Sequence, residues 1–113
     1  MVGKYKVVTL CGSTRFKDDF MRVQEELTLA GNIVISVGMF SHSDGNSAGV
    51  TPEVKTMLDD MHRHKIDMAD EIFVINRNGY IGESTRSEIE YAQKAGKPVT
   101  YMFEHSNSKE EPL

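Results

Sequence analysis

The sequence predicts a small α/β protein with a doubly wound, Rossmann-like parallel sheet of about four or five strands and helices on both faces. Short apolar segments alternate along the chain with longer segments of helical periodicity, and Gly, Pro and Asn mark many of the boundaries. Glycine and hydroxyl residues follow the first and third apolar segments, where open α/β sheets bind ligands. The 113 residues are expected to form one domain over residues 1–103, followed by a polar tail at 104–113.

The first strand and the first helix are expected at residues 4–10 and 16–30. Gly31 and Asn32 are typical of the residues that end a helix in the left-handed conformation. The helix is supported by one apolar stripe, whose members are spaced by three or four residues: Phe16, Phe20, Val23, Leu27 and Ala30.

The second strand is expected at residues 33–37, a β-branched run suited to a buried parallel strand. The loop at 38–50 is rich in Ser, Gly, Asn and His, and its length favours a functional role over a simple connection. Thr51 as N-cap and Pro52 as the first helical residue predict a second helix that extends to about residue 68.

The third and fourth strands are expected at residues 71–76 and 98–103, with a helix at 85–95 between them. Right-handed crossovers favour the strand order 2-1-3-4. The loops after the first and third strands then meet over one crevice. Since only the tail follows the fourth strand, we expect a second subunit to complete the site, in a homodimer or a higher oligomer.

The composition is that of an ordinary globular protein and excludes several classes of partner. The net charge is -4, 39% of the residues are hydrophobic, and no basic patch predicts binding to polymeric nucleic acid. No apolar run approaches the ~18 residues of a membrane span, and the first residues lack a signal-peptide core. The single cysteine, Cys11, excludes an internal disulfide and is typical of a reducing cytoplasm.

The segment Gly12-Ser13-Thr14-Arg15 lies between the first strand and the first helix and is suited to bind phosphate or another anion. The glycine allows a tight turn, the hydroxyls and free N–H groups of the helix start donate hydrogen bonds, and Arg15 adds a planar cation. The alternative is that a hydroxyl only caps the helix and that Arg15 is solvated. The two roles are compatible. The spacing of a P-loop or of a dinucleotide fingerprint is absent.

Glu88 is the candidate for catalysis, because it is expected at the start of a helix beside the crevice. There it is suited to act as a nucleophile or general base. The alternative is that Thr85 and Glu88 form a capping box, in which the carboxylate only satisfies the helix N-terminus. Glu83 lies in the preceding loop, where it either orients a substrate hydroxyl or faces water.

The helix at 52–68 and the residues just after it carry several residues of types that bind metals, at positions Asp59, Asp60, His62, His64, Asp67 and Asp70. Neither a His-Glu-x-x-His nor a paired-cysteine spacing occurs, so neither a metal nor another cofactor is predicted. Most of these side chains are expected on a solvated face, with one or two near the crevice assisting protonation of the leaving group. Cys11 is expected to be a small buried hydrophobe without a readable His partner. His42 is as consistent with ligand contact as with exposure.

Three segments in this order resemble the nucleoside 2-deoxyribosyltransferase superfamily, including its nucleoside 5′-monophosphate N-glycoside hydrolase branch: residues 11–15, 69–75 and 82–92. In the third, STRSEIEYA is similar to the family pattern Gly-Thr-x-x-Glu-[Leu/Ile]-Gly-Tyr-Ala. The resemblance extends over about residues 7–101 and implies that Glu88 is the catalytic glutamate. Its carboxylate attacks C1′, the base leaves, and water or a second base resolves the glycosyl ester.

The resemblance also implies the substrate contacts. Ser13, Thr14 and Arg15 suit the 5′-phosphate, and Arg15 favours a phosphorylated substrate. Ser84 and Thr85 add further hydroxyls.

The sequence also departs from the family pattern. His62 stands near the family's base-contacting aspartate, with Asp60 and Asp67 as nearby candidates. Gly82 falls where the hydrolase branch often carries a phosphate-binding hydroxyl, and Glu90 replaces a glycine.

These observations predict a cytoplasmic enzyme that cleaves or transfers the N-glycosidic bond of a (deoxy)nucleoside or its 5′-monophosphate. A nucleotide-binding or sensing module without turnover is the first alternative. A different hydrolase that uses Asp67 or His62 as its base is the second.

Overall fold

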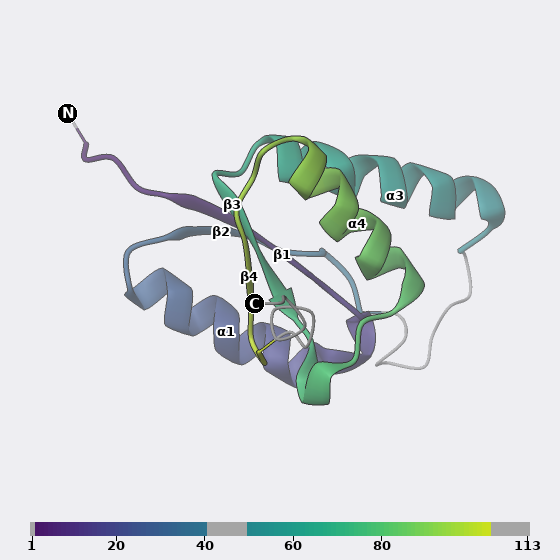
Figure 1. Cartoon of the computed structure of the whole chain (residues 1–113), viewed down its shortest axis with the longest axis horizontal. Helices are drawn as coiled ribbons and strands as arrows, with labels where there is room; N and C mark the ends of the chain where they lie inside the picture. The colour runs from purple at the N-terminus through teal and green to yellow at the C-terminus, as the bar shows by residue number, and fades with distance from the viewer. Residues whose placement is uncertain (1, 41–49, 105–113) are drawn as a thin grey trace, which may run out of the picture.

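The computed structural model describes residues 2–40 and 50–104, which form a four-strand parallel sheet with helices on both faces (Figure 1). The strands are β1 (Val7–Gly12), β2 (Ile33–Ile35), β3 (Glu71–Ile75) and β4 (Val99–Tyr101). The helices are α1 (Lys17–Leu29), α3 (Pro52–Asp67) and α4 (Glu83–Lys94), with 3-10 turns at Thr14–Phe16 and Arg77–Gly79. The order β2-β1-β3-β4 confirms the predicted class and topology. Nearly all of the predicted 38–50 loop and the 104–113 tail lies outside the described residues.

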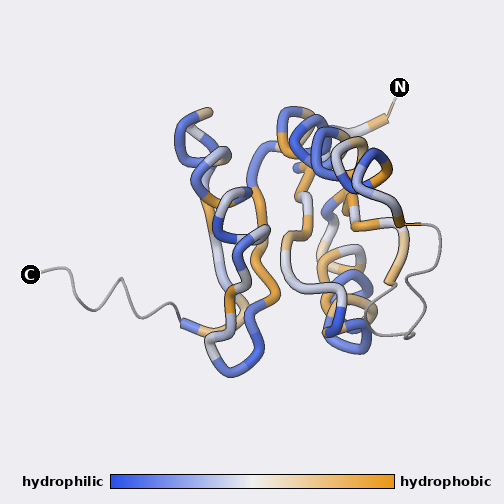
Figure 2. The backbone as a smooth tube through the Cα atoms, turned by 90° about the vertical axis from the view of Figure 1, so that its right-hand side faces the viewer, coloured by the Kyte–Doolittle hydropathy of each residue, from blue (hydrophilic) through white to orange (hydrophobic). Residues whose placement is uncertain are grey.

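Alternating side chains of the central strands form a separate core on each face of the sheet. The core beneath α1 consists of Val8, Leu10, Phe20, Val23 and Ile75. The core beneath α3 and α4 consists of Cys11, Ile66, Ile72, Val74, Ile89 and Ala92. Figure 2 shows hydrophobic stretches along the strands between helices of mixed polarity. Among residues 2–40 and 50–104, no helix is long and apolar enough to cross a membrane.

The strand boundaries differ from the predicted ones in ways that the pairing explains. β1 begins later than predicted and extends to Gly12, because its register with β3 ends at the pair of Gly12 and Ile75. The strand predicted at 33–37 is present, but β2 has only three residues and lies at the edge of the sheet. Ile33 is half exposed, so the expectation of a buried strand is wrong. β-branched residues are common in both edge strands and central strands, so β-propensity alone does not distinguish the two positions.

The loop after β1 begins at a residue that only glycine can occupy without strain. Gly12 has a φ of +151°, and a Cβ there would lie 2.6 Å from the carbonyl oxygen of Ile75. The chain then turns, and the side chain of Ser13 caps the short 3-10 turn by accepting a hydrogen bond from the backbone N–H of Arg15. The helix α1 therefore begins at Lys17, one residue later than predicted.

The helix α4 begins two residues before its predicted start, with Gly82 as the N-cap. Thr85 lies inside the helix with 4% of its surface exposed, so the capping box of Thr85 and Glu88 is wrong. Glu88 falls in the second turn of the helix. Its carboxylate is thus not needed to satisfy the helix N-terminus.

The loop after β3 is fastened to α1 by an ion pair. Asp19 accepts hydrogen bonds from Nε and Nη2 of Arg77 at 2.6 and 2.7 Å, and from Nη2 of Arg22 at 3.3 Å. The neighbouring Asn76 is buried and exchanges two hydrogen bonds with the backbone of Phe103. These contacts hold the loop from two sides.

Candidate functional site

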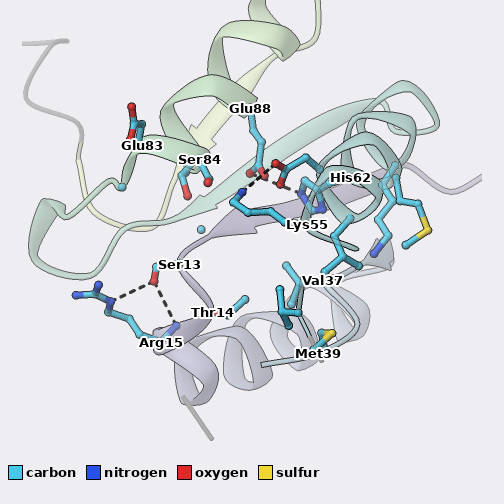
Figure 3. A pocket seen from close by; sticks show the side chains of 18 of the residues that line it. Ser13, Thr14, Arg15, Val37, Met39, Lys55, His62, Glu83, Ser84 and Glu88 are labelled. Atoms are coloured by element: carbon cyan, nitrogen blue, oxygen red, sulfur yellow. Dashed lines mark hydrogen bonds and ion pairs between the residues drawn. The ribbon is translucent and has the colours of Figure 1, made fainter. Parts of the chain in front are cut away.

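A cavity of about 400 Å³ lies at the carboxyl ends of β1 and β3, bordered by α3 and by the start of α4 (Figure 3). Its volume lies within the range of about 300–1,000 Å³ that is typical of small-molecule sites. The residues predicted for the site that line it are Gly12, Ser13, Thr14, Arg15, His62, Gly82, Ser84, Thr85 and Glu88. The two loops expected to meet over one crevice therefore do so.

Asp67 is the predicted substrate-binding residue that the structure separates from the pocket. It ends α3 and accepts a hydrogen bond of 2.8 Å from the hydroxyl of Tyr91. Its distance along the helix from His62 places it more than one turn further from the strand ends. The hydrolase alternative with Asp67 as the base loses its geometric support, whereas His62 keeps it. His42 lies outside the described residues.

One end of the pocket is polar and carries a permanent positive charge. The hydroxyl of Ser13 accepts hydrogen bonds from the backbone N–H and from Nε of Arg15, at 3.3 and 3.2 Å. The guanidinium of Arg15 stacks over the ring of Tyr80 at 4.6 Å. Figure 3 shows Ser84 and Glu83 across the cavity from Ser13 and Arg15. Arg15 is therefore oriented by two neighbours although it is exposed, and both the anion-binding role and the solvated alternative stay open.

The other end of the pocket is apolar. Figure 3 shows Val37 and Met39 at this end, on the opposite side of the cavity from Arg15. The aliphatic lining residues are Val37, Met39, Val50, Leu58 and Met61. These residues were not predictable from the sequence, because they come from a loop and from a helix face whose orientation depends on tertiary packing.

Glu88 points into the pocket between these two ends. Its side chain is 18% exposed, and one carboxylate oxygen lies 3.8 Å from Nε2 of His62. The pKa of Glu88 is raised from 4.5 to about 7, mainly by burial and to a smaller extent by the charge of Asp59. A hydrogen bond with the thiol of Cys11 and the charge of Lys55 act in the opposite direction.

His62 lies on the buried face of α3, one turn before Ile66. Burial, with a contribution from Lys65, lowers the pKa of His62 to about 4, so the imidazole is neutral near pH 7. The 3.8 Å contact with Glu88 is therefore not an ion pair at that pH.

Cys11 has the His partner that the sequence did not reveal, because its Sγ lies 3.4 Å from Nε2 of His62. Burial, with the nearby charge of Glu88, raises the pKa of the Cys11 thiol well above its usual value. Cys11 is fully buried in the core beneath α3 and α4, as expected of a small hydrophobe. His62 lies four residues before Ile66 and therefore on the same face of α3. This spacing is the feature of the sequence that could have placed His62 on the buried face.

Two charged residues of the pocket were not singled out from the sequence. Nζ of Lys55 forms an ion pair of 2.9 Å with Asp59 along α3, and both line the cavity. Nζ of Lys65 donates a hydrogen bond of 2.8 Å to the carbonyl oxygen of Ser36. The part of α3 that lines the cavity therefore carries both positive and negative side chains, whereas the sequence predicted that most of its charged residues face solvent.

Comparison with protein-family models and with curated proteins gives no match. The class of the protein is therefore defined by its own fold and cavity. It is a small Rossmann-like α/β protein with a ligand-sized pocket at the switch point between β1 and β3.

Proposed function

We propose that the protein cleaves or transfers the N-glycosidic bond of a (deoxy)nucleoside 5′-monophosphate, with Glu88 as the nucleophile. The observation that carries this proposal is the position of one half-buried carboxylate between the polar and the apolar end of a single pocket. A nucleotide has the same order of parts: a phosphate, a sugar, and a largely flat base. Its C1′ carbon lies between the phosphate and the base, as Glu88 lies between the two ends.

The polar end supports a phosphate. Arg15 offers a guanidinium held by Ser13 and Tyr80, and guanidinium groups bind phosphate oxygens in pairs. The N-terminus of α4 borders the same end. Its N-cap, Gly82, has no side-chain oxygen to satisfy the first backbone N–H groups of the helix. These N–H groups are free to donate to an anion.

The chemistry follows from the position of Glu88. The carboxylate attacks C1′, a C–O bond forms, and the C–N bond breaks with its electron pair leaving on the base. The base then takes a proton from solvent. Water, or an acceptor base, attacks C1′ of the glycosyl ester and regenerates the carboxylate. The low exposure of Glu88 favours attack, because few waters must be removed from the carboxylate.

The test is the release of free base, measured by chromatography, from a panel of nucleosides and 5′-monophosphates, with and without an acceptor base. We expect Glu88→Gln to lose at least about 1,000-fold in rate while it keeps nucleotide binding. Glu90→Gln is the matched control, because Glu90 lies on the same helix but is exposed.

Each other outcome contradicts the proposal in a distinct way. Binding without base release by the native protein would favour the non-catalytic nucleotide-binding module. Release that survives Glu88→Gln but not His62→Asn would favour a hydrolase with a histidine base. The oligomer expected from the sequence stays a prediction, which light scattering of the same sample tests.

A further inference from the structure

We infer that Cys11, His62 and Glu88 form a binding site for a zinc-class divalent cation at the floor of the pocket. The site lies where the proposed nucleophile lies. Binding of the cation does not depend on the proposed function. Only its consequence for turnover rests on that function.

The donor set is one that zinc prefers. A thiolate, an imidazole nitrogen and a carboxylate oxygen are its common protein ligands, whereas Mg²⁺ and Ca²⁺ prefer oxygen ligands alone. Together the thiolate and the carboxylate supply two negative charges, which match a divalent cation. The three side chains come from β1, α3 and α4.

The distances are close to those of a tetrahedral site. The Sγ atom of Cys11 lies 3.4 Å from Nε2 of His62, and that nitrogen lies 3.8 Å from Oε1 of Glu88. All three donor atoms fall within 4.8 Å of one another. With zinc–ligand bonds of about 2.0–2.3 Å, the donor atoms of a tetrahedral site lie roughly 3.3–3.6 Å apart. A small rotation of the Glu88 side chain closes the remaining gap.

The surroundings hold the donors in place. Cys11 is fully buried and His62 is 7% exposed, so neither side chain has much freedom to turn. Since His62 and Glu88 line the cavity, the fourth position of the cation faces the pocket. That position is open to water or to a ligand.

The nearby lysines do not occupy this place. Nζ of Lys55 is paired with Asp59 at 2.9 Å, and Nζ of Lys65 is bound to the Ser36 carbonyl oxygen at 2.8 Å. A cation on the three donors takes the Glu88 carboxylate out of reach of C1′. The expected consequence is that zinc inhibits base release.

The experiment uses the full chain without a histidine tag, stripped with a chelator and titrated with Co²⁺. We expect a thiolate-to-cobalt charge-transfer band in the near ultraviolet and visible bands of tetrahedral intensity. Both should saturate at one equivalent and disappear when Zn²⁺ displaces the cobalt. The band requires the sulfur atom of Cys11, which is the single cysteine of the chain.

Variants identify the ligands. Because loss of an outer partner alone costs about 10–100-fold in metal affinity, removal of a ligand should cost at least about 100-fold. We expect this loss for His62→Asn and Cys11→Ser, and none for His64→Asn, whose histidine is exposed on the same helix. Circular dichroism confirms that each variant is folded. If Cys11→Ser does not fold, His62→Asn against His64→Asn decides the question.

The proposal is overturned if no charge-transfer band appears, or if His62→Asn and His64→Asn bind Zn²⁺ equally. The cobalt spectrum is read without turnover, so a failure of the proposed function leaves this test intact. If base release occurs, Zn²⁺ should inhibit it over the concentration range of binding, and a chelator should restore it. Activation by Zn²⁺ would overturn the inhibitory consequence.

Discussion

Replacement of the proposed nucleophile is expected to make the protein more stable above neutral pH. In Glu88→Gln, an amide of nearly the same shape replaces a carboxylate whose side chain is only 18% exposed. The pKa of Glu88 rises from 4.5 to about 7, mainly through burial. At about 1.4 kcal/mol for each pKa unit, ionisation of this group costs the folded protein about 3 kcal/mol.

The direction follows from the protons bound in each state. Between pH 4.5 and about 7 the folded protein holds a proton on Glu88 that the unfolded chain has lost, so stability falls as the pH rises through this window. Above pH 7 the loss is complete. Glu88→Gln has no such loss, so its advantage over the native chain should grow by about 2–3 kcal/mol between pH 5 and pH 8. This corresponds to roughly 10 °C or more in Tm for a domain of this size.

Urea unfolding at pH 5 and pH 8, followed by circular dichroism, measures this difference. A chelator is present throughout, because a bound cation would stabilise the ionised carboxylate. Comparing the two pH values removes the packing difference between amide and carboxyl. Glu90→Gln should show no comparable change, since Glu90 is exposed. An advantage of Glu88→Gln that is equal at both pH values would refute the reasoning.

Three further predictions concern the site and the contacts that hold its loops. Asp19→Asn should cost about 1–2 kcal/mol in urea unfolding at pH 7, because the bidentate pair is lost while Arg77, 44% exposed, is re-solvated. Because Arg77 lowers the pKa of Asp19, the loss of stability in Asp19→Asn should shrink as the pH falls below 3.8. A loss that is the same at all pH values would contradict this prediction. Gly12→Ala should destabilise the protein by about 2 kcal/mol or more, because the added Cβ would clash with the backbone of Ile75. Gly31→Ala is the control, since Gly31 also has a positive φ but has no atom near the position of a Cβ. Equal unfolding midpoints for the two variants would argue against a clash. Arg15→Gln should raise the KM for 5′-monophosphates at least about tenfold, with little effect on the KM for unphosphorylated nucleosides. An equal rise for both would show that Arg15 does not bind the phosphate.

The fold was predictable because its determinants are local. Gly31 and Asn32 after α1, and Thr51 with Pro52 before α3, mark the helix boundaries by backbone chemistry that needs no tertiary partner. Strand order follows from the handedness of the crossovers. The start of α4 was missed, because Gly82 and Thr85 are both acceptable N-caps and only packing decides between them.

The candidate site was predictable only in part. The loops after β1 and β3 were brought together correctly, because parallel strands end at the same edge of the sheet. The contact between Cys11 and His62 joins residues 51 positions apart and depends on how α3 docks on β1. No spacing rule reaches across such a separation. The apolar lining from Leu58 and Met61 depends on the same docking.

The division of the apolar interior into two halves has a consequence for evolution and engineering. The proposed nucleophile and its neighbours stand on the half beneath α3 and α4, whereas Phe20 and Val23 belong to the half beneath α1 and do not line the pocket. Substitutions in the two halves are expected to act additively, since the sheet separates them. Stabilising substitutions in the α1 half can therefore offset the loss of stability caused by substitutions near the pocket that change specificity.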